Sequence, residues 1–185
     1  MANCDYIARE VQRIKRKYGE NDPARLAQEM GIIVEYEPMG TYDGCCKGFF
    51  ITHRRKKHIT INSDLPEPIR RIILIHEIAH AVLHWKSGSC AAFHDFGLFD
   101  TADQKEYEAN IFGADFLMSD EDVLELLNED ISFFGAAAKL YVPAEMLDFK
   151  FRLMKRRGYE LIEAPITSTG DFLKDIDLDG GISYD

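Results

Sequence analysis

Apolar residues recur along this chain with two different periods, and the change of period separates helices from strands. Near the N-terminus the helical period is kept by Tyr6, Ile7, Val11, Ile14 and Tyr18, while arginine and lysine occupy the opposite face. Later helical segments are bounded by aspartate or serine before the first turn, proline within it, or glycine after the last turn. The pattern predicts helices over residues 5–18, 23–30, 65–85, 103–118, 120–127, 131–140 and 143–157.

Three short runs rich in β-branched and aromatic residues predict strands over 32–36, 46–52 and 58–62. The basic stretch 53–57 between the last two is interpreted as a solvated hairpin tip, with a substrate-facing or nucleic-acid patch as the alternative. We expect a small antiparallel sheet beside the helix over 65–85, in an α+β fold.

Composition limits the class of protein. A chain of 185 residues is one domain, or one domain with a small appendage. Its net charge of −10 argues against nucleic-acid binding by the whole surface. The sequence shows no secretory signal and no apolar run of about 18 residues, so no membrane association is expected. The four cysteines form no C-x-x-C pair, which fits a reducing cytoplasm better than a disulfide framework.

The long apolar run over 72–85 contains the motif H-E-x-x-H. On a helix, His76 and His80 project from one face, one turn apart, where a single metal ion can bind both. Glu77 lies about 100° round the helix, close enough to reach a water molecule on that metal. The rest of the helix is apolar on almost every side, which is typical of a buried helix. Burying these three side chains without partners is costly, and a metal removes that cost. The alternative is core histidines bonded to the backbone, with Glu77 paired to an arginine.

A zinc ion held by two histidines of one helix needs a third protein ligand. The next helix carries Glu106, Asn110 and Gly113 on one face, with Glu108 about 160° away from Glu106. We predict that Glu106 binds the metal and that Asn110 hydrogen-bonds a metal-bound histidine. Gly113 would allow the two helices to approach closely. Glu108 is expected to face solvent, and a solvated surface acid is also the alternative for Glu106.

The motif H-E-x-x-H-A-x-L-H followed by K-E-x-E-A-N-x-F-x-A-x-x-L-M resembles the ImmA/IrrE family of zinc metallopeptidases. The resemblance covers about residues 5–120, and 121–157 more weakly. It implies a minimal zincin-like fold with Zn²⁺ held by His76, His80 and Glu106, and with Glu77 as the catalytic acid/base. Gly113 stands where the family more often has alanine, and Ser119 where it often has proline. Neither departure touches the chemistry.

The resemblance also implies a function, because members act as anti-repressors in mobile genetic elements, including phages, or in stress responses. The expected activity is that of a cytoplasmic zinc endopeptidase that cleaves a helix-turn-helix (XRE-type) repressor. One alternative is a zinc-containing regulatory protein that displaces its partner without proteolysis. Another is a toxin–antitoxin component with a helix-turn-helix partner.

Two further histidines are candidates to stabilise the oxyanion of the reaction. His84 projects between His80 and Glu77 on the helical wheel, and His94 lies in the following loop. An ordinary polar or surface histidine is the alternative for each.

The sequence predicts three parts: a metallopeptidase domain over 1–120, a helical extension resembling a helix-turn-helix over 121–160, and a flexible acidic tail over 161–185. The last helix of the extension is basic. It is interpreted as a solvated face on a helical cap, with docking on the repressor or on DNA as the less favoured alternative. Residues 175–180 match the first half of an EF-hand loop, but its twelfth position falls beyond residue 185, so calcium binding is not expected.

Overall fold

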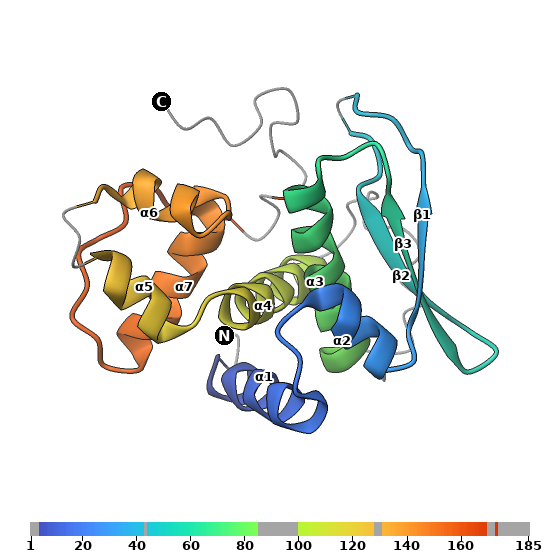
Figure 1. The fold of residues 1–185 in the computed structure, drawn as a ribbon, viewed down its shortest axis with the longest axis horizontal. Helices are drawn as coiled ribbons and strands as arrows, with labels where there is room; N and C mark the ends of the chain where they lie inside the picture. Colours follow the sequence, from blue (N-terminus) through green and yellow to red (C-terminus); the bar gives the residue numbers. More distant parts are fainter. Residues whose placement is uncertain (1–3, 43, 85–99, 128–130, 170–172, 174–185) are drawn as a thin grey trace.

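The computed structural model describes residues 4–42, 44–84, 104–127, 131–169 and 173. Of residues 100–103 it describes the backbone alone. Within these residues a three-stranded sheet and helix α3 lie on one side of helix α4, and helices α5–α7 lie on the other (Figure 1). The elements are α1 (Cys4–Tyr18), α2 (Pro23–Glu29), β1 (Ile33–Glu37), β2 (Gly48–His53), β3 (Lys56–Asn62), α3 (Glu67–Leu83), α4 (Asp100–Leu117), α5 (Asp120–Leu127), α6 (Phe133–Lys139) and α7 (Ala144–Arg156).

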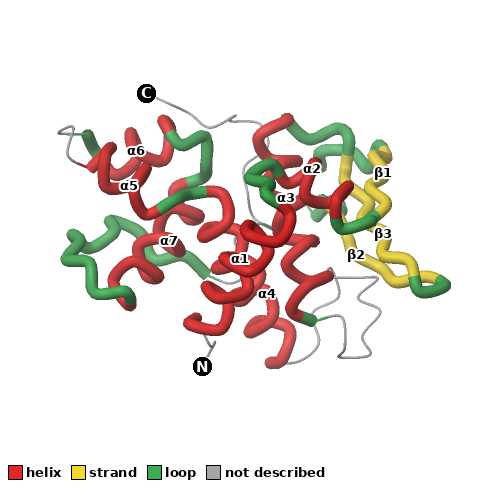
Figure 2. The backbone as a smooth tube through the Cα atoms, turned by 60° about the horizontal axis from the view of Figure 1, so that its bottom comes forward, coloured by secondary structure: helices red, strands yellow, loops and turns green. Residues whose placement is uncertain are grey.

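The sheet is mixed, and the expectation of an antiparallel sheet is therefore wrong. Strands β2 and β3 form an antiparallel hairpin, whereas β1 pairs in parallel with β3, which gives the order β1-β3-β2. The cause is the connection from β1 to β2. It passes over the end of β3 instead of turning back beside β1, so β3 separates the other two strands. An α+β fold with a small sheet beside α3 is nevertheless observed (Figure 2).

One buried side chain holds that connection in place. The Oδ1 atom of Asn62, at the end of β3, accepts hydrogen bonds from the backbone N–H groups of Met39 and Asp64 at 3.1 and 3.0 Å. Its Nδ2 atom donates to the carbonyl oxygens of Gly40 and Cys46 at 2.7 and 3.0 Å. Asn62 is fully buried. It therefore supplies partners for backbone groups of a loop that lies outside the strand ladder.

Helix α3 lies at the centre of the hydrophobic core, with most of its side chains buried, as the apolar run predicts. Glycines on two neighbouring elements allow this packing. A Cβ atom at Gly48 of β2 would lie 2.6 Å from Cγ2 of Ile73, so the strand lies directly on the helix. A Cβ atom at Gly113 of α4 would lie 3.3 Å from Cγ2 of Ile75, which agrees with the close approach expected there.

The C-terminal helices pack on α4 through α7, and the expectation of a solvated basic face on α7 is wrong for its central lysine. Lys150 is 1 % exposed and pairs with Asp115 of α4 at 2.8 Å and Asp120 of α5 at 2.6 Å. Arg157 pairs with the same two acids. Arg152 and Lys155 also pair with acids. Lys150 and Arg157 thus connect the last helix and its C-terminal end to α4 and α5, whereas the partners of Arg152 and Lys155 lie on α7 itself and in the segment that follows it.

Residues 161–169, the first part of the predicted tail, lie against α7. Asp148 accepts hydrogen bonds from the backbone N–H of Ser168 at 2.9 Å and from Arg152, which also donates to the carbonyl of Ser168. Except for Leu173, the rest of the tail with its EF-hand-like residues lies outside the described residues, and so does Cys90. The division of the chain at residues 120 and 160 stays a prediction. Over the described ranges, no helix is both long enough and apolar enough to cross a bilayer.

Candidate metal centre

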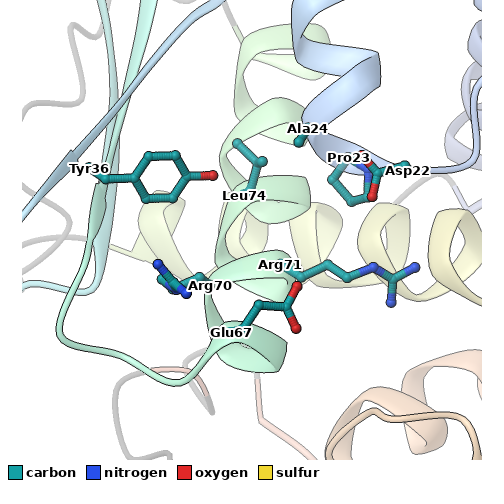
Figure 3. A pocket seen from close by; sticks show the side chains of 8 residues that line it. All are labelled: Asp22, Pro23, Ala24, Tyr36, Glu67, Arg70, Arg71 and Leu74. Carbon is teal, nitrogen blue, oxygen red and sulfur yellow. The ribbon is translucent and has the colours of Figure 1, made fainter.

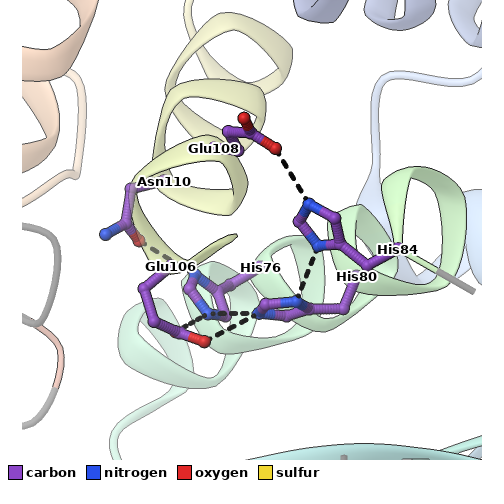
Figure 4. Close-up of polar contacts among 6 residues, drawn as sticks. All are labelled: His76, His80, His84, Glu106, Glu108 and Asn110. Atoms are coloured by element: carbon purple, nitrogen blue, oxygen red, sulfur yellow. Dashed lines mark hydrogen bonds and ion pairs between the residues drawn. The ribbon is translucent and has the colours of Figure 1, made fainter. Parts of the chain in front are cut away.

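The two histidines of the H-E-x-x-H motif and one acid of α4 meet at a single point (Figure 4). The Nε2 atoms of His76 and His80 are 3.1 Å apart. The Oε2 atom of Glu106 lies 3.0 Å from Nε2 of His76, and its Oε1 atom lies 3.5 Å from Nε2 of His80. Both histidines are buried, and the Glu106 side chain is 12 % exposed. The three residues predicted as ligands are thus brought together by α3 and α4.

These distances test whether the three side chains fit around one ion. A tetrahedral ion with bonds of about 2.0–2.1 Å to nitrogen and oxygen places neighbouring ligand atoms roughly 3.3 Å apart. The observed separations of 3.0, 3.1 and 3.5 Å bracket that value. Within the described residues, this is the one group of three or more potential ligand side chains close enough to hold an ion. Two imidazoles and a carboxylate are donors that fit a divalent transition metal.

Asn110 fixes the orientation of the first histidine, as the sequence predicts for its position. Its Oδ1 atom lies 2.9 Å from Nδ1 of His76 and Asn110 is fully buried. An amide oxygen only accepts, so Nδ1 of His76 carries the proton and Nε2 presents its lone pair to the centre. Burial acts to lower the pKa of His76, but the hydrogen bond and charge of Glu106, with smaller contributions from Glu77 and Asn110, raise it overall.

Glu108 and His84 are arranged differently from expectation. Nε2 of His84 lies 3.0 Å from Oε2 of Glu108, and Nδ1 of His84 lies 3.1 Å from Nδ1 of His80. The side chains of Glu108 and His84 are only 19 % and 11 % exposed, so Glu108 is not a solvated acid and His84 is not a surface histidine. Both ring nitrogens of His84 are engaged, which leaves neither of them to bind an oxyanion. His94, the other oxyanion candidate, lies outside the described residues.

Glu77 follows His76 on α3 and is 3 % exposed. Its negative charge contributes to the raised pKa of His76, which places the carboxylate in the electrostatic environment of the centre. The H-E-x-x-H motif requires a proton acceptor that is not itself a metal ligand. Glu77 fits this requirement, because it is buried and is not among the three ligand side chains.

A small pocket of about 140 Å³ lies elsewhere on α3, between that helix, α2 and β1 (Figure 3). Its lining includes Glu67, Arg70 and Arg71, which lie roughly 140–240° round the helix from His76 at about 100° per residue. The pocket therefore opens on a different side of α3 from the metal centre. Acids and arginines both line it, so its charge favours neither anions nor cations.

Comparison with known proteins places this geometry in a family. The model of the IrrE N-terminal-like domain, a peptidase family, matches residues 27–152, which is more than half of the chain. This chain belongs to the IrrE N-terminal-like domain family. The match runs from α2 to α7 and includes the whole His76/His80/Glu106 cluster, so the candidate metal centre lies inside the family's domain.

The chain is also similar to a phage protein. It is 31 % identical over 145 residues to "Uncharacterized immunity region protein 2" of Bacillus phage phi105, a match that covers 76 % of this chain and 85 % of the phage protein. The IrrE N-terminal-like chain described here thus shares most of its length with a protein encoded in a phage immunity region.

Proposed function

We propose that this protein is a zinc-dependent endopeptidase that inactivates a helix-turn-helix (XRE-type) repressor by limited cleavage. The observation that carries the proposal is the meeting of His76, His80 and Glu106 beside a buried Glu77, within a chain of a peptidase family. A purely structural metal would not need Glu77, because a proton acceptor beside the ligands serves only a site that activates water.

Zinc is the ion we propose, because two neutral imidazoles and one carboxylate leave a fourth tetrahedral position open, as in catalytic zinc sites. Asn110 makes His76 suited to that role by holding its proton on Nδ1. An ion bound there would supply a water molecule with a pKa near about 7 and would polarise the scissile carbonyl.

The chain's own residues perform the proton transfers in this proposal. Glu77 accepts the proton of the attacking water and then delivers it to the nitrogen of the leaving amine, so that one carboxylate acts as base and then as acid. Burial of Glu77 keeps bulk water away from that proton. His76, His80 and Glu106 keep their positions because they project from two helices packed directly on each other.

The proposed partner is a repressor, for two reasons. The first is the resemblance to anti-repressors of mobile genetic elements, which the similarity to an immunity region protein of a phage supports. The chain has a net charge of −10, and DNA-binding repressors carry basic surfaces, so electrostatic attraction favours their encounter. Limited cleavage of such a repressor would release the genes it silences.

The test is co-expression with the helix-turn-helix repressor encoded nearest this gene, followed by intact-mass measurement of the repressor. We expect two fragments with the wild-type protein and an intact repressor with Glu77→Gln, which should retain zinc. The matched control is Glu125→Gln, the same substitution at an exposed acid of α5. Cleavage by Glu77→Gln would refute the catalytic role of that residue. An intact but displaced repressor with the zinc-loaded wild type would refute proteolysis and support action by binding alone.

A further inference from the structure

His84 connects the second metal-binding histidine to an acid on the neighbouring helix. Its Nδ1 atom lies 3.1 Å from Nδ1 of His80, and its Nε2 atom lies 3.0 Å from Oε2 of Glu108. The backbone N–H of His84 also donates to the carbonyl oxygen of His80 at 3.0 Å, at the point where α3 ends. The other carboxylate oxygen of Glu108 accepts a hydrogen bond from Gln104 at 2.9 Å. The chain of contacts is therefore continuous from Glu108 to the metal centre (Figure 4).

The chemistry of these groups allows a single direction for the hydrogen bonds when a metal is to bind. An ionised carboxylate only accepts, so Nε2 of His84 donates to Glu108. A neutral imidazole has one N–H, so Nδ1 of His84 is an acceptor, and the proton between the two rings belongs to Nδ1 of His80. Nε2 of His80 then presents its lone pair towards Nε2 of His76 and Glu106, where the ion would lie.

The opposite arrangement would prevent metal binding. If Nδ1 of His84 donated to His80, then Nδ1 of His80 would be the acceptor and its proton would lie on Nε2, the atom that faces the centre. Glu108 prevents this arrangement because it requires a proton on the far nitrogen of His84. A hydrogen bond to the second nitrogen is the usual way in which proteins select the tautomer of a metal-binding histidine.

We propose that Glu108 and His84 are positioning residues that together hold His80 as the Nδ1–H tautomer and so prepare it to bind the metal. This inference rests on the proposed function in that it assigns the centre to a metal, and it adds the means by which the second ligand is oriented. His76 is oriented by one neutral side chain, Asn110, whereas His80 is oriented by an acid acting through a second imidazole.

The first experiment measures zinc affinity by competition with a chelating dye, which requires no substrate. His84→Phe removes the acceptor but keeps a ring, and it should weaken zinc binding roughly 10–100-fold, the usual effect of losing such a partner. His84→Gln restores an acceptor oxygen and should recover part of that loss. Glu108→Leu should weaken binding in the same direction. Glu125→Leu, the same change at an exposed acid of α5, is the matched control and should leave zinc affinity unchanged.

A double variant tests whether Glu108 acts through His84. If it does, His84→Phe combined with Glu108→Leu should bind zinc no more weakly than His84→Phe alone, because the acid has nothing left to orient. Losses that multiply would show that the two residues act independently and would overturn the proposal. Thermal unfolding of each variant confirms that the chain is folded at the temperature of the titration.

The second experiment observes the tautomers directly, by long-range ¹H–¹⁵N correlation spectra of the histidine rings in the metal-free protein. We expect the proton of His80 on Nδ1 and the proton of His84 on Nε2, and we expect Glu108→Leu to return His80 to a mixture of tautomers. A proton on Nε2 of His80 in the wild type would overturn the proposal. So would zinc affinity that is unchanged in His84→Phe.

These outcomes are distinct from failure of the proposed function. If the wild type binds zinc through the predicted network but cleaves no repressor, the endopeptidase proposal fails while the positioning role stands. If the wild type cleaves its repressor and the variants bind zinc as tightly as the wild type, the positioning role fails alone. Absence of zinc binding by the wild type would overturn both.

Discussion

Replacing Lys150 with methionine tests whether the buried charges hold the C-terminal helices on α4. Lys150 and Arg157 of the C-terminal region face Asp115 and Asp120, so the network contains two positive and two negative charges. The side chain of Lys150 is 1 % exposed and that of Asp115 is 2 % exposed. Methionine fills most of the volume of the lysine stem, so Lys150→Met removes one charge and leaves the network with a net negative charge in a buried position.

The magnitude follows from the contacts that remain. Removing one partner of a buried ion pair costs about 3–5 kcal/mol, because the other charge stays buried without compensation. Here Arg157 still pairs with Asp115 at 2.7 Å and with Asp120 at 2.6 Å, which places the expected loss at the lower end, about 3 kcal/mol. For a chain of this length, each kcal/mol lowers the melting temperature by roughly 2–4 °C, so Lys150→Met should melt roughly 6–12 °C below the wild type.

The assay is urea denaturation followed by circular dichroism, with two further variants. Arg13→Met removes an exposed i,i+3 pair with Glu10 and should cost no more than about 1 kcal/mol. Lys150→Met combined with Asp120→Asn leaves one neutral pair, Asp115 with Arg157, and should be more stable than Lys150→Met alone by about 1 kcal/mol or more. A loss in Lys150→Met no larger than in Arg13→Met, or a double variant less stable than the single one, would refute the reasoning.

Three further predictions concern the fold. Burial raises the pKa of Asp120, but hydrogen bonds and charges from Lys150 and Arg157 outweigh burial and lower it overall. A carboxylate with a depressed pKa stabilises the folded state above its unfolded pKa, and this stabilisation is lost as the pH falls through the folded pKa. The wild type should therefore lose stability below about pH 4, and Asp120→Asn should lose less. Thermal melts between about pH 6 and 2 will measure the difference. Asn62→Leu leaves several buried backbone groups of the β1–β2 connection without partners, and each unpaired group costs about 1–3 kcal/mol. Chemical denaturation should therefore show that the free energy of unfolding falls by more than about 3 kcal/mol. A smaller loss would mean that water replaces the amide. Gly48→Val places a Cβ atom 2.6 Å from a methyl group of Ile73 on α3. The same assay should show the loss of stability expected from overpacking, about 1–3 kcal/mol. Unchanged stability would show that β2 shifts freely.

The sequence predicts the helices and most of the candidate centre well, because both depend on local spacing. His76 and His80 share a face through the i,i+4 relation alone, and Asp22 caps α2 by accepting from the N–H of Arg25 three residues later. The strand order is not local in this sense. It depends on Asn62, which binds a connection some twenty residues earlier in the chain, and nothing in the pattern of β-branched residues signals that role.

The position of Glu108 shows a second limit of reasoning from periodicity. A helical wheel treats α4 as having one face towards α3, and Glu108 lies about 160° from Glu106 on that wheel. In the structure Glu106 meets His76 and His80, while Glu108 meets His84 one turn further along α3. The available signal was the i,i+4 spacing of His80 and His84, which extends the polar stripe of α3 by a turn and creates a place for a second acid.

Helix α4 links the candidate centre to the C-terminal helices. The spacing of its residues indicates that metal binding and the buried ion pairs contribute independently to the stability of the chain. Glu106 contacts the histidines of α3, and Asp115 contacts Lys150 of α7. Nine residues separate them, about 13.5 Å along the helix at 1.5 Å per residue, which exceeds the roughly 7–10 Å beyond which mutational effects usually add. A bound metal would stabilise the folded chain by about 4 kcal/mol at a thousand times its dissociation constant. Since the ion-pair network takes no part in binding that metal, Lys150→Met should lower stability by the same amount with and without it.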